Sequence, residues 1–478
     1  MKVCIIAEGC YPYVVGGVSS WIHNIIKSFP DIEFNLIAII SNRKGSGSFA
    51  YDLADNLTKI HEVYLQDVDW VGQKKTTSNR IRLNKREFEA LRSLVIGENV
   101  DWVTVFRLFN RTNISINNLL MSPQFLSITK EYYSQKYINI SFSDFLWTLR
   151  SIYLPLFLAL KSKLPKADIY HCASTGYAGI IGSKALSIYP EAKLLISEHG
   201  IYTREREEEI IKAKWVQSIY KTIWIDQFRK MSLGAYYFAD LVTALFEQAH
   251  ELQIELGCST HKAIITPNGI NTEIYKDIPQ KDVDDPYINV GAILRVTPIK
   301  DVKTMINAFY YAHKKEPRLK LWIMGPVDED PEYADECYEL VRALKAENIE
   351  FTGRIKTTDY IGKMDMTILT SISEGQPLTI LEGFAAKKPC IATNVGNCYG
   401  LIHGENDPFG DAGIVVPVMN ISEISNAILK LAKAPNLVKQ MGESGYQRLM
   451  YRYKNEYMIE TYRKIYKVLF DLNNSILK

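Results

Sequence analysis

The sequence predicts an α/β fold built from two Rossmann-like domains. Short β-branched apolar runs alternate with apolar-periodic helical segments in both halves of the chain, as in parallel sheets covered by helices. The chain has 478 residues, of which 47% are hydrophobic and 23% charged, so it is long enough for two domains with large cores. Open α/β sheets bind their ligands beyond the carboxyl ends of the strands, and we expect the functional residues there.

The composition excludes several classes of protein. The formal net charge is +2 and the charges are interspersed, so no nucleic-acid partner is expected. The seven cysteines include no pair with zinc-finger spacing, which favours reduced thiols in the cytoplasm. The chain starts with a strand and not with a secretory signal, and its longest apolar region, residues 145–160, is too short to span a membrane. We expect a cytoplasmic protein, with a peripheral position on the cytoplasmic face of the membrane left open.

The first predicted unit is a strand at residues 2–7, a loop, and a helix at residues 19–29. The loop ends in Gly16 and Gly17, which permit a close approach to the backbone, although turns use paired glycines often. A second strand is expected at residues 34–40. From residue 41 to 163 the alternation breaks into a predicted helical insertion with loops, which serves either ligand or partner recognition or as extra shell for the core.

Two histidines lie at the ends of the strands that follow this insertion. His171 ends one strand, and His199 follows the next, flanked by charged residues and glycine. His199 is the stronger candidate for positioning a sugar hydroxyl or stabilising a leaving phosphate, and His171 competes with it. Arg204 and Arg206 lie shortly after His199. They either bind a phosphate or a second substrate that acts as an acceptor, or they pair with neighbouring glutamates on a solvated helix.

The second domain begins after a polar linker. Residues 276–285 are rich in Pro, Asp and Lys, so the predicted domains cover residues 1–275 and 276–450, with a final helical segment at 451–478. A strand at residues 287–293 leads to Arg295 and Lys300. The planar guanidinium of Arg295 and the ammonium charge of Lys300 could neutralise a diphosphate without a metal. Alternatively, both residues could be ordinary surface bases at a helix start.

No acidic pair is placed as a divalent metal site would require. An Asp-x-Asp pair would have to sit at a strand end, but residues 328–330 (Asp-Glu-Asp) lie in a turn, where we expect them to be solvated. A dehydrogenase is excluded because no Gly-x-Gly-x-x-Gly follows the first strand.

The most informative stretch is SISEGQPLTILEG at residues 371–383, which follows a short apolar strand. Pro377 suits the first position of a helix, and the amides of Leu378 and Thr379 then point outward at the positive end of the helix dipole. A phosphate fits such a helix terminus.

Two carboxylates flank this predicted helix start. Glu374 precedes the helix, and Glu382 lies within it. Their spacing suits a nucleotide sugar, with Glu374 accepting hydrogen bonds from the sugar, the helix terminus meeting the diphosphate, and Glu382 accepting from the ribose. The alternative is a capped turn whose glutamates are favoured only by the helix dipole.

This stretch resembles the signature of retaining glycosyltransferases of family 4, which have the GT-B fold of two facing Rossmann-like domains. Glu374, Gly375, Pro377 and Glu382 match the family's Glu-Gly-x-Pro-x-x-x-x-Glu pattern position for position. The resemblance implies a GT-B protein with a helical insertion in its N-terminal domain, nucleotide-base contacts after the strand that ends at Gly353, and a last helix that packs back on the first domain. The candidate catalytic residues are His199, Glu374, Arg295 and Lys300, and the candidate substrate-binding residues are Gly16, Gly17, Arg204, Arg206, Gly353, Arg354, Ile355, Gly375, Gln376, Pro377, Leu378, Thr379 and Glu382.

The runs at residues 11–21 and 197–206, together with the long insertion, are similar to family members that serve Pel exopolysaccharide synthesis. The resemblance implies transfer of a hexose or N-acetylhexosamine from UDP-glucose or a UDP-N-acetylhexosamine to a polysaccharide acceptor. It implies retention of configuration, no metal or other cofactor, and an inner-membrane Pel-type synthesis complex as a candidate partner. Two alternatives are a non-catalytic nucleotide-sugar-binding subunit of a membrane polysaccharide complex and an epimerase of the same architecture.

Overall fold

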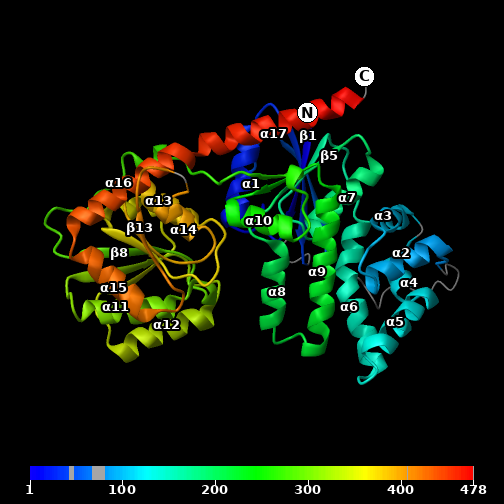
Figure 1. Cartoon of the computed structure of the whole chain (residues 1–478), viewed down its shortest axis with the longest axis horizontal. Coiled ribbons are helices and arrows are strands. Elements are labelled where there is room, and N and C mark those ends of the chain that lie inside the picture. The colour runs from blue at the N-terminus through cyan, green and yellow to red at the C-terminus, as the bar shows by residue number, and fades with distance from the viewer. Residues whose placement is uncertain (42–47, 67–80, 113, 406, 477–478) are drawn as a thin grey trace. The chain divides into compact units, whose positions relative to one another are not determined.

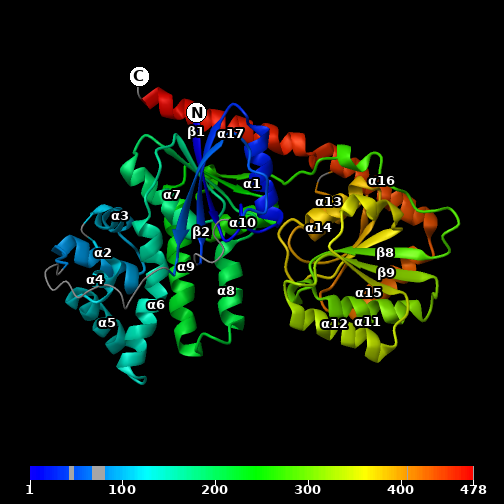
Figure 2. The ribbon, with the colours of Figure 1, turned by 180° about the vertical axis from the view of Figure 1, so that it is seen from behind.

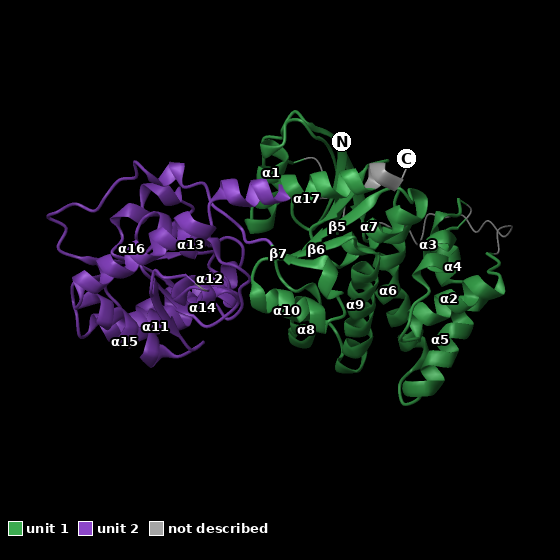
Figure 3. Cartoon of the chain, turned by 45° about the horizontal axis from the view of Figure 1, so that its top comes forward, with its two compact units in different colours: residues 1–265, 463–478 green, residues 266–462 purple. Residues whose placement is uncertain are grey.

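The computed structural model describes residues 1–41, 48–66, 81–112, 114–405 and 407–476. The chain forms two compact units, shown in separate colours in Figure 3. Unit 1 comprises Met1–Ile265 and Arg463–Lys478, and unit 2 comprises Thr266–Tyr462. The units therefore divide before the predicted boundary at residue 275, and the last segment rejoins unit 1 from residue 463, where 451 was predicted.

Unit 1 contains a parallel sheet whose described strands follow the order β3-β2-β1-β4-β5-β6-β7 (Figure 1). The order reverses between β1 and β4, which creates a topological switch point at their carboxyl ends. The strands read as apolar runs because helices cover both faces of the sheet. Their bounds are β1 Lys2–Glu8, β2 Glu33–Ile40, β3 Leu57–Tyr64, β4 Ile169–Cys172, β5 Lys193–Ser197, β6 Leu241–Ala244 and β7 Ala263–Ile265.

Strand β3 corrects the prediction that residues 41–163 are a helical insertion with loops. It pairs in parallel with β2 as the edge strand of the sheet. Its sequence LTKIHEVY carries many polar residues because most of the strand is only half-buried or exposed. An edge strand of this kind lacks the continuous apolar run by which the buried strands are recognised.

The remainder of the insertion is helical, as predicted. Its helices begin where a short polar side chain accepts a hydrogen bond from a backbone N–H of the first turn. Asn84, Asp101, Ser115, Ser122 and Ser141 have this role. The helices of unit 1 are α1 Gly17–Ser28, α2 Lys85–Val95, α3 Trp102–Asn110, α4 Ile116–Leu120, α5 Pro123–Lys136, α6 Phe142–Lys161, α7 Tyr177–Ile188, α8 Tyr202–Lys212, α9 Ser218–Phe238 and α10 Glu247–Glu255.

The apolar helix α6 belongs to the core of unit 1. It contains Pro155, and its buried Arg150 donates a hydrogen bond from Nε to the carbonyl of Leu120 at 2.9 Å. This bond gives the buried guanidinium a polar partner inside an otherwise apolar cluster. Within the described ranges, no helix has the length and hydrophobicity to cross a membrane.

Unit 2 contains a second parallel sheet, with its described strands in the order β10-β9-β8-β11-β12-β13. Its switch point lies between β8 and β11, so the loops that follow these two strands are neighbours. The strands are β8 Ile288–Ile293, β9 Leu319–Met324, β10 Ile349–Gly353, β11 Met366–Leu369, β12 Cys390–Thr393 and β13 Gly413–Val416. The helices are α11 Val302–His313, α12 Pro331–Leu344, α13 Leu378–Ala385, α14 Cys398–His403, α15 Ile421–Ala432 and α16 Pro435–Arg452.

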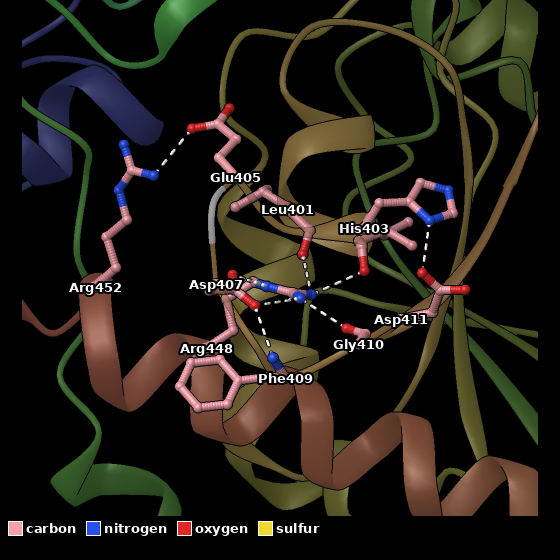
Figure 4. A network of polar contacts seen from close by, with 10 residues as sticks. Leu401, His403, Glu405, Asp407, Phe409, Gly410, Asp411, Arg448 and Arg452 are labelled. Carbon is pink, nitrogen blue, oxygen red and sulfur yellow. Dashed lines mark hydrogen bonds and ion pairs between the residues drawn. The ribbon is translucent and has the colours of Figure 1, made fainter.

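A buried arginine holds one edge of unit 2 together (Figure 4). Arg448 on α16 is 1% exposed, and its Nε and Nη2 atoms donate to both carboxylate oxygens of Asp407 at 2.7 and 2.8 Å. Its remaining N–H groups donate to the carbonyls of Leu401, Ile402 and Gly410. Every N–H group of the guanidinium is thus used to fix α14 and the residues that follow it against α16.

The last helix, α17 Asn455–Ile476, starts in unit 2 and ends in unit 1. Within unit 1, the Tyr466 hydroxyl lies 2.7 Å from Nδ1 of the buried His171, and the Arg463 guanidinium lies 4.7 Å from the centre of the Phe29 ring. The end of α17 therefore completes the core beside β4 and α1.

Candidate functional site

In unit 2 the loops after β8 and β11 are tied together at the switch point. The Thr370 hydroxyl donates to the carbonyls of Lys300 and Asp301 at 3.0 and 3.2 Å, and the Ile372 amide donates to the carbonyl of Ile299 at 2.8 Å. These bonds fix the signature loop relative to the basic turn that follows β8. The sequence spacing alone did not predict this link.

Lys300 and Glu374, both predicted as catalytic residues, form an ion pair at this junction. The Lys300 Nζ lies 2.5 Å from the Glu374 Oε1, and the side chains are 17% and 11% exposed. The Ser371 hydroxyl also donates to Oε1 of Glu374. A cation and a carboxylate are therefore presented together at the carboxyl end of β11, with the carboxylate oriented by two donors.

The helix that follows the signature begins one residue later than predicted. Pro377 is the N-cap of α13 and not its first residue, so Leu378 and Thr379 form the start of the helix. Gln376 fixes this start, because its Oε1 accepts from the Asn268 amide at 2.9 Å and its Nε2 donates to the Asn268 carbonyl at 3.2 Å. Both polar atoms of the Gln376 side chain are thus committed to the backbone of unit 2.

A third loop, after β12, contacts the backbone of the signature stretch at residues 371–383. Sequence reasoning did not assign this loop a role. Gly396 has a φ of +50°, and a Cβ atom at this position would lie 2.3 Å from the carbonyl oxygens of Glu374 and Gly375. The Asn397 amide donates to the Gly375 carbonyl at 2.9 Å. The signal in the sequence was the glycine in the turn after a buried strand, and the structure shows that it adopts a positive φ.

Glu382 lies on α13 in a largely apolar environment. Burial raises the pKa of this carboxyl to about 7, although a hydrogen bond from the Tyr275 hydroxyl lowers it. A carboxyl group with such a pKa changes charge near neutral pH and gains from any additional donor that stabilises its ionised form. The ribose role predicted for Glu382 would supply such donors.

The other predicted residues of unit 2 lie on neighbouring turns. Arg295 donates from Nη1 to Glu329 at 2.8 Å, and Arg354 donates to Asp328 at 3.2 Å. Gly353 ends β10 with a φ of +68°, and the half-buried Ile355 follows it. The acidic turn at residues 328–330 is solvated, as predicted, with Asp328 and Glu329 exposed. These two side chains pair with Arg354 and Arg295, and Asp330 caps α12.

In unit 1, Gly16 and Gly17 leave open space in front of the backbone. Gly16 is the N-cap of α1, with a φ of 178° that any residue can adopt, and Gly17 is the first residue of the helix. A Cβ atom at either position would meet nothing within 4 Å. The fold itself therefore does not require glycine here, and close approach of a ligand remains the predicted reason for both residues.

His199 lies beside a cavity of about 210 Å³ at the carboxyl ends of β1, β4 and β5. Its ring meets Trp21 edge-on, with centroids 4.3 Å apart, and burial lowers the pKa of His199 to about 4. The imidazole is therefore neutral near pH 7. Its Nε2 atom is buried and has no hydrogen-bond partner among the described residues, so a ligand group that reached it would satisfy it.

Sequence reasoning missed Glu8, which lies at the end of β1 in the same cavity. Its carboxylate accepts hydrogen bonds from the Tyr202 hydroxyl and the Tyr177 amide, each at 3.1 Å. Burial raises the pKa of Glu8, although Arg206 at 3.8 Å lowers it. Arg206 also pairs with Glu209, whereas Arg204 is exposed on α8.

His171, the competing candidate, is a core residue. Its Nδ1 and Nε2 atoms lie 2.7 Å from the Tyr466 hydroxyl and 2.8 Å from the Ser197 hydroxyl. Burial lowers the pKa of His171 to about 3. With both ring nitrogens engaged inside unit 1, His171 has a structural role, and His199 is the histidine that reaches the cavity.

The described residues contain no group of three or more His, Cys, Asp or Glu side chains arranged to hold a metal. Unit 2 presents a cation, a carboxylate and a helix start together, and unit 1 presents a neutral imidazole and a carboxylate beside a small cavity. By itself, the set in unit 2 can bind a phosphorylated ligand, and the set in unit 1 can bind a hydroxyl group, through charge and hydrogen bonds.

Comparison with known families divides the chain in the same way. Residues 1–261 match the family described as "Domain of unknown function (DUF3492)", and residues 287–434 match the one described as "Glycosyl transferases group 1". The chain is 25% identical to N-acetyl-alpha-D-glucosaminyl L-malate synthase of Bacillus anthracis over 41% of its own length, and the match spans about half (48%) of that relative. It is also 25% identical to UDP-Gal:alpha-D-GlcNAc-diphosphoundecaprenol alpha-1,3-galactosyltransferase of Escherichia coli, covering 61% of this chain and 72% of that relative.

Solved structures with low sequence identity to this chain have a similar fold. HepE of Anabaena, solved with UDP and glucose, superposes with a TM-score of 0.60 at 13% identity and covers 98% of this chain and 99% of its own. Sucrose-phosphate synthase of Thermosynechococcus elongatus gives 0.62 at 13% identity, with the same coverage of both chains. The predicted fold class, two Rossmann-like domains of the GT-B type, is confirmed.

Proposed function

We propose that this chain, which belongs to the family described as "Domain of unknown function (DUF3492)", is a glycosyltransferase that transfers a hexose or N-acetylhexosamine from a UDP-sugar to a polysaccharide acceptor. The observation that carries the proposal is the Lys300–Glu374 ion pair beside the start of α13. Ligands of this fold class bind at such a switch point, so the ion pair is placed to contact a ligand. The relative named as a galactosyltransferase supports the same interpretation.

The donor sites in unit 2 follow from the chemistry of a nucleoside diphosphate sugar. Lys300, with the first amides of α13, would bind the diphosphate and stabilise its charge as it leaves. Glu374 would accept hydrogen bonds from the sugar hydroxyls, and Glu382 from the ribose. The turn from Gly353 to Ile355 would contact the base. HepE, which shares this fold, was solved with UDP and with UDP-glucose, which supports UDP as the nucleotide.

The reaction we propose proceeds with retention of configuration. The leaving phosphate would accept the proton of the attacking hydroxyl on the same face of the sugar, so no strongly basic side chain is required. Catalysis would then rest on positioning and on charge stabilisation by Lys300 and Arg295. The neutral His199 would accept from, or donate to, a sugar hydroxyl through its unpartnered Nε2.

For the acceptor we propose a growing exopolysaccharide, as in the Pel system, with this chain in the role of PelF. The runs at residues 11–21 and 197–206 support this assignment. The cavity around Glu8 and His199 is small and polar, as suits a sugar unit. A peripheral position in a membrane synthesis complex is part of the same proposal.

Calorimetry with UDP-glucose, UDP-N-acetylglucosamine, UDP-N-acetylgalactosamine and GDP-mannose tests the donor site. We expect one UDP-sugar to bind and the double variant Arg295→Ala with Lys300→Ala to lose at least tenfold in affinity. Lys303→Ala is the matched control, because Lys303 is a surface base of α11 paired with Glu336. If no sugar nucleotide binds, the proposal fails. Donor turnover that requires no acceptor would instead indicate an epimerase, and binding without any turnover would indicate a non-catalytic subunit.

A further inference from the structure

The turn between α8 and α9 carries apolar side chains on its outer surface. The two helices run side by side to this turn at the lower end of unit 1 in Figures 1 and 2. Trp215 in the turn is 71% exposed, and Ile211 and Ile219 beside it are also exposed. Trp147, near the start of α6, is 54% exposed. We call these four residues the hairpin tip.

The start of α6 lies next to the start of α9, which brings Trp147 to the same end of unit 1. The rings of Phe145 and Tyr220 are 6.5 Å apart, and Tyr220 shares a side-chain hydrogen bond with Thr148. Trp147 and Ile219 are the immediate chain neighbours of Thr148 and Tyr220. These contacts place Trp147 at the same end of unit 1 as the exposed residues of the turn.

The hairpin is held rigid by its own aromatic core. Successive ring centroids from Trp215 to Trp224, Phe228 and Tyr202 are 6.1, 5.7 and 5.9 Å apart. The Lys221 Nζ donates to the Ile211 carbonyl at 2.6 Å and closes the turn. The Trp215 side chain is thus held at the surface by packing on one edge while most of the indole faces outward.

The charges near the tip favour an anionic partner. The glutamates of the adjoining part of α8 are neutralised: Glu207 pairs with Arg229, Glu208 with Lys212, and Glu209 with Arg206. Two further lysines, Lys214 and Lys221, have no carboxylate within ion-pair distance in the described part of the chain. They leave positive charge beside the exposed tryptophan, and the exposed Asp144 at the start of α6, which acts on Tyr220, is an acidic group at the same end of unit 1.

We propose that the hairpin tip docks on the surface of a lipid bilayer that contains anionic headgroups. Indole rings favour the interface between headgroups and acyl chains, and the isoleucines can bury their side chains at the same depth. Lysines that flank them are attracted to anionic lipid. Lysine is depleted at protein interfaces, so its combination with tryptophan and isoleucine at a projecting turn favours lipid over a protein partner. The inference does not depend on the proposed transferase activity.

Vesicle flotation of the full chain tests the proposal. We expect the protein to float with phosphatidylcholine vesicles containing about 30% phosphatidylglycerol, and at least fivefold less protein to float after Trp215→Ser with Ile211→Ser. Lys214→Glu should lower the bound fraction about twofold at low salt and have less effect at high salt. The matched control is Tyr237→Ser, because Tyr237 is 75% exposed at the opposite end of α9.

Failure to float and unchanged flotation of the double variant are the two flotation results that would overturn the proposal. One is failure of the wild-type protein to float with the anionic vesicles. The other is flotation of the double variant at the wild-type level, with circular dichroism showing that both proteins are folded. Binding to native membranes that is abolished by protease treatment of those membranes, without binding to vesicles, would indicate a protein partner and would also overturn it. Loss of flotation in Tyr237→Ser would show that the effect is not specific to the tip.

Discussion

The raised pKa of Glu382 predicts that replacing this residue stabilises the protein and weakens its ligand binding. Burial raises the pKa from 4.5 in the unfolded chain to about 7 in the folded one. Below pH 4.5 both states hold the proton and there is no penalty. As the pH rises to 7 the unfolded state releases its proton first, so stability falls and then levels off. Glu382→Gln removes this loss.

The expected gain follows from the size of the shift. A pKa raised from 4.5 to about 7 corresponds to at most about 3 kcal/mol at pH 8. Because Glu382 is only half-buried and water can relax around it, we expect about 1–2 kcal/mol. For a unit of this size, that corresponds to a rise of about 2–8 °C in the unfolding temperature. Near pH 4.5 the variant and the wild type should unfold at the same temperature.

Thermal unfolding followed by calorimetry at pH 4.5, 6 and 8 measures the effect. Glu339→Gln is the control, because Glu339 is an exposed glutamate of α12 in the same unit. The same samples should bind UDP about tenfold more weakly after Glu382→Gln if the carboxylate accepts from the ribose, and UDP binding by the wild type near pH 7 should release a proton. A variant that is no more stable than the wild type at pH 8, or that gains equally at all three pH values, would refute the electrostatic reasoning.

Three further predictions concern residues that hold the sites in place. Arg448→Met leaves Asp407 buried without its partner and should cost about 3–5 kcal/mol, measured by urea unfolding. His199→Ala should lower transferase turnover by about 10–100-fold with little change in stability. His171→Ala should instead destabilise unit 1 by about 1–3 kcal/mol, and thermal unfolding of both variants measures this difference. Gly396→Ala forces a Cβ against the signature backbone and should weaken UDP-sugar affinity by about tenfold in calorimetry, while the Gly410→Ala control should not. The assignments would be contradicted if His199→Ala and His171→Ala changed stability equally, or if Gly396→Ala and Gly410→Ala weakened UDP-sugar affinity equally.

The two-sheet fold could be predicted because most of its strands are buried on both faces. β1, β2 and β11 therefore appear as continuous apolar runs, and the turns after β1 and β11 carry predicted site residues. The edge strand β3 could not be recognised, because a strand with one open side tolerates polar residues at most positions.

The predicted site residues of unit 2 depended on a linear motif, and linear motifs carry no information about which loops meet. The Lys300–Glu374 pair joins residues from two strands that are neighbours only through the switch point, and Gly396 supports them from a third loop. Glu8 was missed for a similar reason, because its role appears only where β1 and β4 lie side by side. Choosing between His171 and His199 required their hydrogen-bond partners, which the sequence does not state.

The final helix also affects how the protein is made. Tyr466 contacts His171 across 295 positions of the chain, and Arg463 covers Phe29. During synthesis, the whole of unit 2 must therefore leave the ribosome before unit 1 can close its core. Until then, the polar face of a buried histidine and the ring of a core phenylalanine are open to water and to other chains. The nascent protein thus passes through a state in which unit 1 is nearly complete but its core is not yet covered by α17. The lifetime of this state is set by the time needed to translate unit 2.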